Sequence, residues 1–164
     1  MSTSSTNYHL LAIPAYYIFS IAPHIYAQSI LTASGYKVNN ANPKASLSPD
    51  AVKGKVPDAV FQKYQRAENA QSNNIEQMPL FAVAILASIM AERSTVTGLG
   101  RAVVDGDATG LTTFVASWFA VRAAYDVAYV AIADHEKSFI RSTLYAVGSG
   151  LAGWQIWKAA ALLG

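Results

Sequence analysis

Four long hydrophobic stretches alternate with polar connectors along the chain. They are residues 10–33, 70–92, 111–133 and 139–163. A helix needs about 20 predominantly apolar residues to cross the hydrocarbon core of a bilayer, and each stretch is long enough. Pro14 and Pro23 fall inside the first stretch, where a membrane helix tolerates proline. The pattern predicts an all-α fold in which residues 1–164 form one integral membrane domain, an up-down bundle of four transmembrane helices.

The connectors predict the orientation of this bundle. The first connector, residues 34–57, has the Asn, Pro, Ser, Gly and Lys content of a loop. In an up-down bundle the first and third connectors share a side, and basic residues gather there: Lys37, Lys44, Lys53, Lys55, Lys63, Arg66, Lys137 and Arg141. The other side has Arg93, Arg101 and Lys158. Because basic residues mark cytosolic loops, we expect the first and third connectors to face the cytosol.

Composition agrees with a membrane protein and excludes several function classes. Apolar residues make up 52% of the chain and charged residues 13%, about half of the usual share of roughly 25%. Without cysteine the chain has no disulfide, no thiolate metal site and no thiol nucleophile of its own. A net charge of +2 without a Lys/Arg run argues against nucleic-acid binding. No His-Glu metal motif or phosphate-binding glycine loop occurs, so no metal site is predicted.

Polar residues interrupt this apolar pattern near one end of three predicted helices. In the segment RAENAQSNNIEQMPLF, residues 66–81, the polar positions recur at spacings of three and four, which places them on one helical face. Up-down topology brings this face to the same end as the polar residues of the third and fourth helices. The residues concerned are Arg66, Asn69, Asn73, Glu76, Arg122, Tyr125, Asp126, Tyr129 and Arg141.

Two interpretations of this convergence stay open at the level of residue types. Arg122 lies near the middle of its helix, where an unpaired cation costs at least about 2.5–3.5 kcal/mol. Asp126 and Glu76 are its expected partners. In the first interpretation these three charges form a structural network that locks the bundle. In the second, the polar residues form a cationic pocket, open to the cytosol and adjacent to lipid, for a charged cofactor and a lipophilic substrate.

At these residues the chain resembles the MAPEG family, the membrane-associated proteins in eicosanoid and glutathione metabolism. The resemblance rests on Asn73 and Glu76 as an Asn-x-x-Glu signature, on RAAYDVAY at residues 122–129, and on Arg141 at the start of the last helix. It implies a homotrimer with glutathione bound between subunits in the endoplasmic reticulum membrane, the site facing the cytosol. It also implies a glutathione-dependent transferase or peroxidase that acts on a lipophilic electrophile.

The resemblance also implies roles for individual residues. Arg141 would stabilise the glutathione thiolate, with Tyr129 as the second candidate for this catalytic role. The cofactor would be bound by Arg66, Asn73, Glu76, Arg122, Tyr125 and Tyr129.

One residue and the length of one segment depart from the family pattern. Asn69 stands where characterised eicosanoid-type members have an arginine, and the twelve positions from Tyr129 to Arg141 (141 − 129) form a longer segment than in the mammalian synthases. Asn69 favours two alternatives to the transferase or peroxidase. One is an isomerase or cyclase of a hydrophobic metabolite, dependent on glutathione or independent of it. The other is a non-catalytic, lipid-binding membrane scaffold of the same fold.

Overall fold

The computed structural model describes residues 7–99 and 107–164, with residues 95–99 described by their backbone alone. Every regular element in these residues is a helix, as the all-α prediction requires. Four helices are long: α1 (Tyr8–Ala33), α4 (Asp58–Leu99), α5 (Leu111–Ala131) and α6 (Phe139–Leu163). Two are single turns: α2 (Pro43–Ser46) and α3 (Pro49–Val52).

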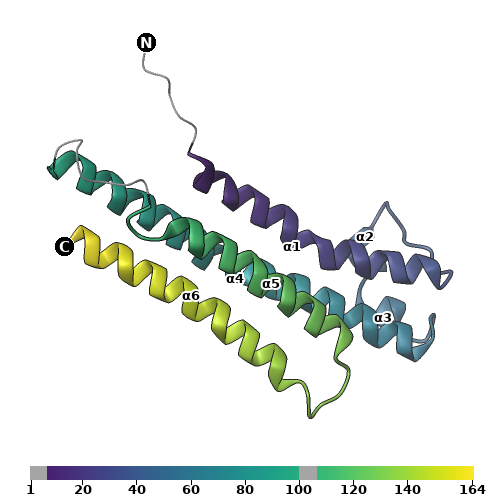
Figure 1. Ribbon diagram of the computed structural model, residues 1–164. Helices are drawn as coiled ribbons and strands as arrows, with labels where there is room; N and C mark the ends of the chain where they lie inside the picture. Colours follow the sequence, from purple (N-terminus) through teal and green to yellow (C-terminus); the bar gives the residue numbers. More distant parts are fainter. Residues whose placement is uncertain (1–6, 100–106) are drawn as a thin grey trace.

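The four long helices lie side by side and alternate in direction, as Figure 1 shows. The first and third connectors lie at one end of the bundle, which we call the basic end. The start of α1 and the end of α6 lie toward the other end (Figure 1). Helix α4 is central, because it packs against α1, α5 and α6. The predicted up-down order is therefore present in the arrangement of the helices.

Membrane spans are supported for two of the four helices by length and composition. In the described part of the chain, α1 and the Asp58–Ser94 part of α4 are long and apolar enough to cross a membrane. Helix α5 contains Arg122 and Asp126, and α6 contains Gln155 and Lys158, so polar residues interrupt the apolar sequence of these two helices. Four spanning helices accordingly stay a prediction.

An aromatic cluster holds α1, α4 and α5 together at the centre of the bundle. The ring centroid of Phe81 lies 4.9 Å from that of Trp118 and 4.9 Å from that of Tyr16. All three side chains are buried, and aromatic pairs at such distances add to the stabilisation from buried area. The Tyr16 hydroxyl also donates a hydrogen bond to the backbone oxygen of Asn74 at 3.1 Å. This cluster fixes the position of α4 along the bundle axis relative to α5. It lies next to the polar residues of the two helices.

The first connector is more ordered than the loop that its composition predicts. Asn42 and Ser48 cap α2 and α3, and each helix begins with a proline, which suits the first helical position. Val52 and Val56 are buried against α1 and α4 in a second apolar cluster. A prediction from composition alone misses this, because two buried valines are too few to change the average polarity of 24 residues (34–57).

Candidate functional site

A polar cavity of about 330 Å³ lies at the basic end of the bundle, among α4, α5 and α6. Helix α4 contributes one lining residue, α5 two, and α6 with its N-cap four. They are Asn73, Tyr125, Tyr129, Ser138, Arg141, Ser142 and Tyr145. Four of the predicted site residues, Asn73, Tyr125, Tyr129 and Arg141, therefore line the same cavity.

Aromatic and hydrogen-bond contacts fix these four side chains relative to one another. The Asn73 amide donates to the Tyr125 hydroxyl at 2.5 Å. The Tyr125 and Tyr129 rings are tilted, with centroids 5.3 Å apart. The Arg141 guanidinium carbon lies 4.6 Å from the centroid of the Tyr129 ring, a distance typical of a cation–π contact. The longer segment between Tyr129 and Arg141 therefore does not separate the two residues.

Behind the cavity, Asn74 links two charges of α5, the buried Arg122 and the partly buried Asp126. Arg122 is fully buried, and its Nε donates to Asn74 Oδ1 at 2.9 Å, joined by a second bond from Nη2. Asn74 Nδ2 in turn donates to both carboxylate oxygens of Asp126, at 2.9 and 3.0 Å. Because one amide pairs with both a cation and an anion, it bridges two charges that share a helix. A network therefore connects Arg122 and Asp126, two of the three predicted members, but it does so through Asn74 and not by a direct ion pair.

The prediction that Glu76 is a partner of Arg122 was wrong. Glu76 is exposed on the surface of the single chain, whereas Asn74 is fully buried. Successive residues of a helix point about 100° apart, so Glu76 cannot turn toward α5 while Asn74 does. Sequence reasoning missed Asn74 because it favoured a charged partner for a charged residue.

Arg122 supports the cavity from behind and is absent from its lining. Its guanidinium carbon lies 4.3 Å from the ring centroid of Tyr125 and 5.7 Å from that of Tyr145, and both tyrosines line the cavity. Its Nη1 atom is buried without a hydrogen-bond partner among the described residues. A positive charge therefore lies directly behind the aromatic wall, and a cofactor contact by Arg122 stays a prediction.

The remaining predicted residues lie outside the cavity lining. Arg66 Nε donates to the backbone oxygen of Val130 at 3.1 Å and so joins α4 to the end of α5. Glu76 and Asn69 are exposed on α4. The contacts of Arg66 and Glu76 with a cofactor stay predictions for the assembled protein.

Three lining residues were missed in the sequence: Ser138, Ser142 and Tyr145. They recur at spacings of four and three along the start of α6, beside Arg141. The same rule of shared helical faces that selected residues on α4 would have found them on α6.

The cavity presents hydrogen-bond donors and one cation to a ligand. Arg141 contributes a guanidinium group, Asn73 an amide, and the tyrosines and serines their hydroxyl groups. No carboxylate is among the lining residues, so the arrangement favours an anionic ligand. In the part of the chain that the structure describes, no three His, Asp or Glu side chains are placed to hold a metal ion.

Comparison with known proteins identifies the family. No curated protein and no solved structure matches the chain. The family model described as "MAPEG family" matches residues 10–161, which include all four long helices except a few terminal residues. The match therefore covers every residue that lines the polar cavity. It supports a membrane protein of the glutathione and eicosanoid metabolism type. This chain belongs to the MAPEG family.

Proposed function

We propose that this protein is a glutathione-dependent membrane transferase or peroxidase that acts on a lipophilic electrophile. One observation carries the proposal: Asn73, Tyr125, Tyr129 and Arg141 come from three helices and line one cavity. When bound, glutathione supplies the thiol nucleophile that the cysteine-free chain lacks.

The groups in and around the cavity fit glutathione, which carries two carboxylates, an ammonium group and a thiol. Donors from Arg141, Asn73 and the serines suit the carboxylates and the thiolate. Glu76 follows Asn73 by three residues on the same helical face, and is the carboxylate proposed for the ammonium group. The volume of about 330 Å³ falls at the lower end of the range for small-molecule sites, roughly 300–1,000 Å³.

Arg141 is the residue proposed to activate the thiol. A free thiol has a pKa near 8.5, so most of it is protonated at neutral pH, whereas the reactive species is the thiolate. A neighbouring guanidinium lowers the thiol pKa because it stabilises the negative charge. The Tyr129 ring holds the Arg141 side chain by a cation–π contact, and the Tyr129 hydroxyl is a second donor for the thiolate.

We further propose that the protein lies in the endoplasmic reticulum membrane as a homotrimer, with four spanning helices per subunit. The excess of basic residues on the side of the first and third connectors favours a cytosolic position for the basic end and its cavity. Because the chain has no cysteine, single cysteines test this orientation without background labelling. An impermeant thiol reagent should label Lys53→Cys and His135→Cys from the cytosolic side of sealed membranes. Ala108→Cys should be protected, and labelling of all three from one side would contradict the up-down arrangement in the membrane.

A turnover assay tests the reaction. The purified protein in detergent should conjugate glutathione to 1-chloro-2,4-dinitrobenzene or reduce cumene hydroperoxide, with Arg141→Ala reducing the rate by at least about 100-fold, the lower range for loss of one transition-state interaction. Lys137→Ala removes an exposed cation from the third connector, just before α6, and should leave the rate unchanged. Equal rates in the Arg141→Ala and unsubstituted proteins would remove Arg141 from the mechanism.

The exposed Asn69 favours a second candidate. If glutathione binding is too weak without an arginine at this position, the same fold serves as a lipid-binding scaffold or as an isomerase or cyclase of a hydrophobic metabolite. Asn69→Arg discriminates between these possibilities. Tighter glutathione binding in this variant, together with no binding in the unsubstituted protein, would favour the second candidate over the transferase.

A further inference from the structure

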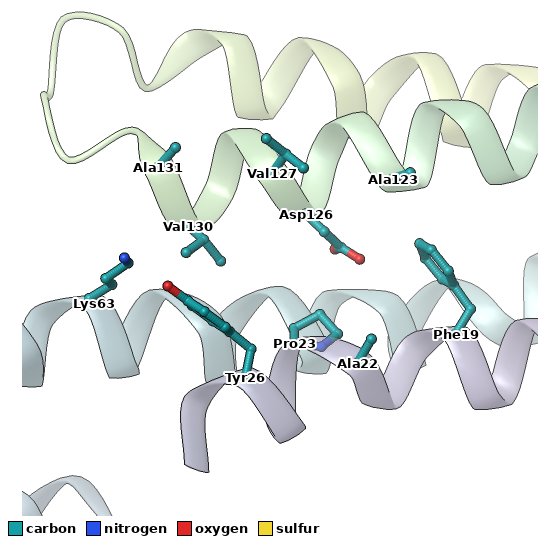
Figure 2. Close-up of a pocket in the computed structure, with 10 residues that line it drawn as sticks. All are labelled: Phe19, Ala22, Pro23, Tyr26, Lys63, Ala123, Asp126, Val127, Val130 and Ala131. Carbon is teal, nitrogen blue, oxygen red and sulfur yellow. The ribbon is translucent and has the colours of Figure 1, made fainter. Parts of the chain in front are cut away.

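A second cavity, of about 500 Å³, opens between α1, α4 and α5 and shares no lining residue with the polar cavity. Figure 2 shows its walls. Apolar side chains form most of them: Phe19 and Pro23 from α1, and Val127 and Val130 from α5. Its volume of about 500 Å³ is within the range of small-molecule sites, and its walls offer a hydrocarbon chain few polar atoms.

Two cations border one end of this cavity. Lys63 lines it, with Nζ 5.4 Å from the centroid of the Tyr26 ring. Arg66 follows by three residues on α4 and donates to the backbone oxygen of Val130, a residue of the cavity wall. Among the described residues neither cation forms an ion pair. The ion pair found there joins His24 to Glu68. Both charges are thus available to an anion at this end.

The carboxylate in the cavity wall does not cancel these charges. Figure 2 shows Asp126 partway along the cavity, with Val130 and Tyr26 between it and Lys63 and with Phe19 beyond it. Both Asp126 oxygens accept hydrogen bonds from Asn74, which also accepts from Arg122. The Asp126 oxygens are therefore hydrogen-bonded within the bundle, and apart from this carboxylate the wall is mostly apolar, with a cationic end.

We propose that this cavity binds a membrane phospholipid with an anionic headgroup. The phosphate lies against Lys63 and Arg66, and one acyl chain lies along Phe19, Pro23 and Val127. Basic pockets between membrane helices bind anionic headgroups in this manner. The cations lie at the basic end of the bundle, next to the first connector, and this is where headgroups of that leaflet would lie. The two cavities share no lining residue, and in this proposal Arg66, which the family resemblance gives to glutathione, binds the phosphate instead.

Native mass spectrometry of the full chain tests the proposal. The protein is extracted in detergent and supplied with equal amounts of phosphatidylglycerol and phosphatidylcholine. We expect one phosphatidylglycerol per chain, retained at least about five-fold better than phosphatidylcholine. Lys63→Gln should abolish this preference, and Val127→Trp should reduce retention of both lipids because the indole fills the cavity. Lys53→Gln removes an exposed lysine of the first connector and should retain the preference.

Three results would overturn the proposal. The first is an unchanged preference in Lys63→Gln. The second is equal retention of the two lipids by the unsubstituted protein. The third is displacement of phosphatidylglycerol by the same concentration of oleate or inorganic phosphate, which would assign the site to a free anion. Thermal unfolding in the same detergent shows whether each variant is folded, and glutathione is left out so that the two sites are tested separately.

Discussion

At the scale of single residues, the site depends on two neighbouring asparagines that form different hydrogen bonds. Asn73 donates to Tyr125 at the edge of the polar cavity, whereas Asn74 joins Arg122 to Asp126 behind it. Each asparagine of α4 thus pairs with one of two successive residues of α5. Because the Arg122 guanidinium contacts the Tyr125 ring, the buried network supports the cavity wall.

Substitution of the two asparagines should lower the free energy of unfolding to different extents. Asn74→Ala leaves Arg122 and Asp126 without their shared partner, and we expect a loss of about 1–3 kcal/mol in the free energy of unfolding. Asn73 is only partly buried and makes one hydrogen bond, so Asn73→Ala should cost about 0.5–1.5 kcal/mol. Denaturation in detergent measures both. A smaller loss for Asn74→Ala than for Asn73→Ala would contradict the assigned roles.

These asparagines also show which contacts can be predicted from the sequence and which cannot. Spacing rules correctly grouped Asn73 with Tyr125, Tyr129 and Arg141, because helical periodicity and up-down order are both local properties. They did not reveal that Asn74 faces α5, since that depends on the rotation of α4. A second series on α4, Ala67, Ala70, Asn74, Gln77 and Phe81, follows the same spacing of three and four and is the buried one. Packing of Phe81 against Trp118 shows which of the two faces lies inward.

At the scale of the helices, a small residue lets α6 approach α5. A Cβ atom at Gly148 would lie 3.7 Å from Arg122 Cδ and 3.9 Å from a methyl carbon of Val121, which is ordinary contact. A larger side chain would meet the buried arginine. The position of α6, and with it of Arg141 and Tyr145, therefore depends on the size of residue 148.

Substitution at Gly148 should show a threshold in size. We expect Gly148→Ala to change stability by less than about 1 kcal/mol, because the methyl group fits. Gly148→Leu should destabilise by about 1–3 kcal/mol through overpacking against Arg122. Gly150→Leu is the control, since nothing lies within 4 Å of its added Cβ. Thermal unfolding of the three variants in one detergent checks this, and equal effects of leucine at both positions would refute it.

At the scale of the whole molecule, α4 presents an exposed stripe that one chain leaves uncovered. Its residues recur at spacings of three and four, the period that supports a left-handed helical seam between subunits. They are Asn69, Ser72, Glu76, Pro79, Val83, Leu86 and Met90. Polar side chains on a membrane helix are costly against lipid, so the end with Asn69 and Glu76 favours cover by a protein neighbour. This stripe supports the proposed homotrimer and a subunit-bridging role for Glu76.

A bulky substitution in the stripe tests the assembly. Light scattering coupled to size-exclusion chromatography should give a protein mass of three chains for the unsubstituted protein. Val83→Trp should shift this mass toward that of one chain, because the indole prevents close packing of α4 against the neighbouring subunit. Ile18→Trp places the same side chain on an exposed position of α1 and should leave the mass unchanged. A single-chain mass for the unsubstituted protein would contradict the trimer.

The central claim is that Arg141 stabilises a glutathione thiolate in the polar cavity, and ultraviolet difference spectroscopy tests it most directly. At millimolar glutathione and neutral pH, the purified protein should produce the absorbance of a bound thiolate. Arg141→Ala should abolish that signal while the oligomer stays intact, and Lys137→Ala should keep it. No thiolate signal and no glutathione binding by the unsubstituted protein, or an unchanged signal in Arg141→Ala, would contradict the claim.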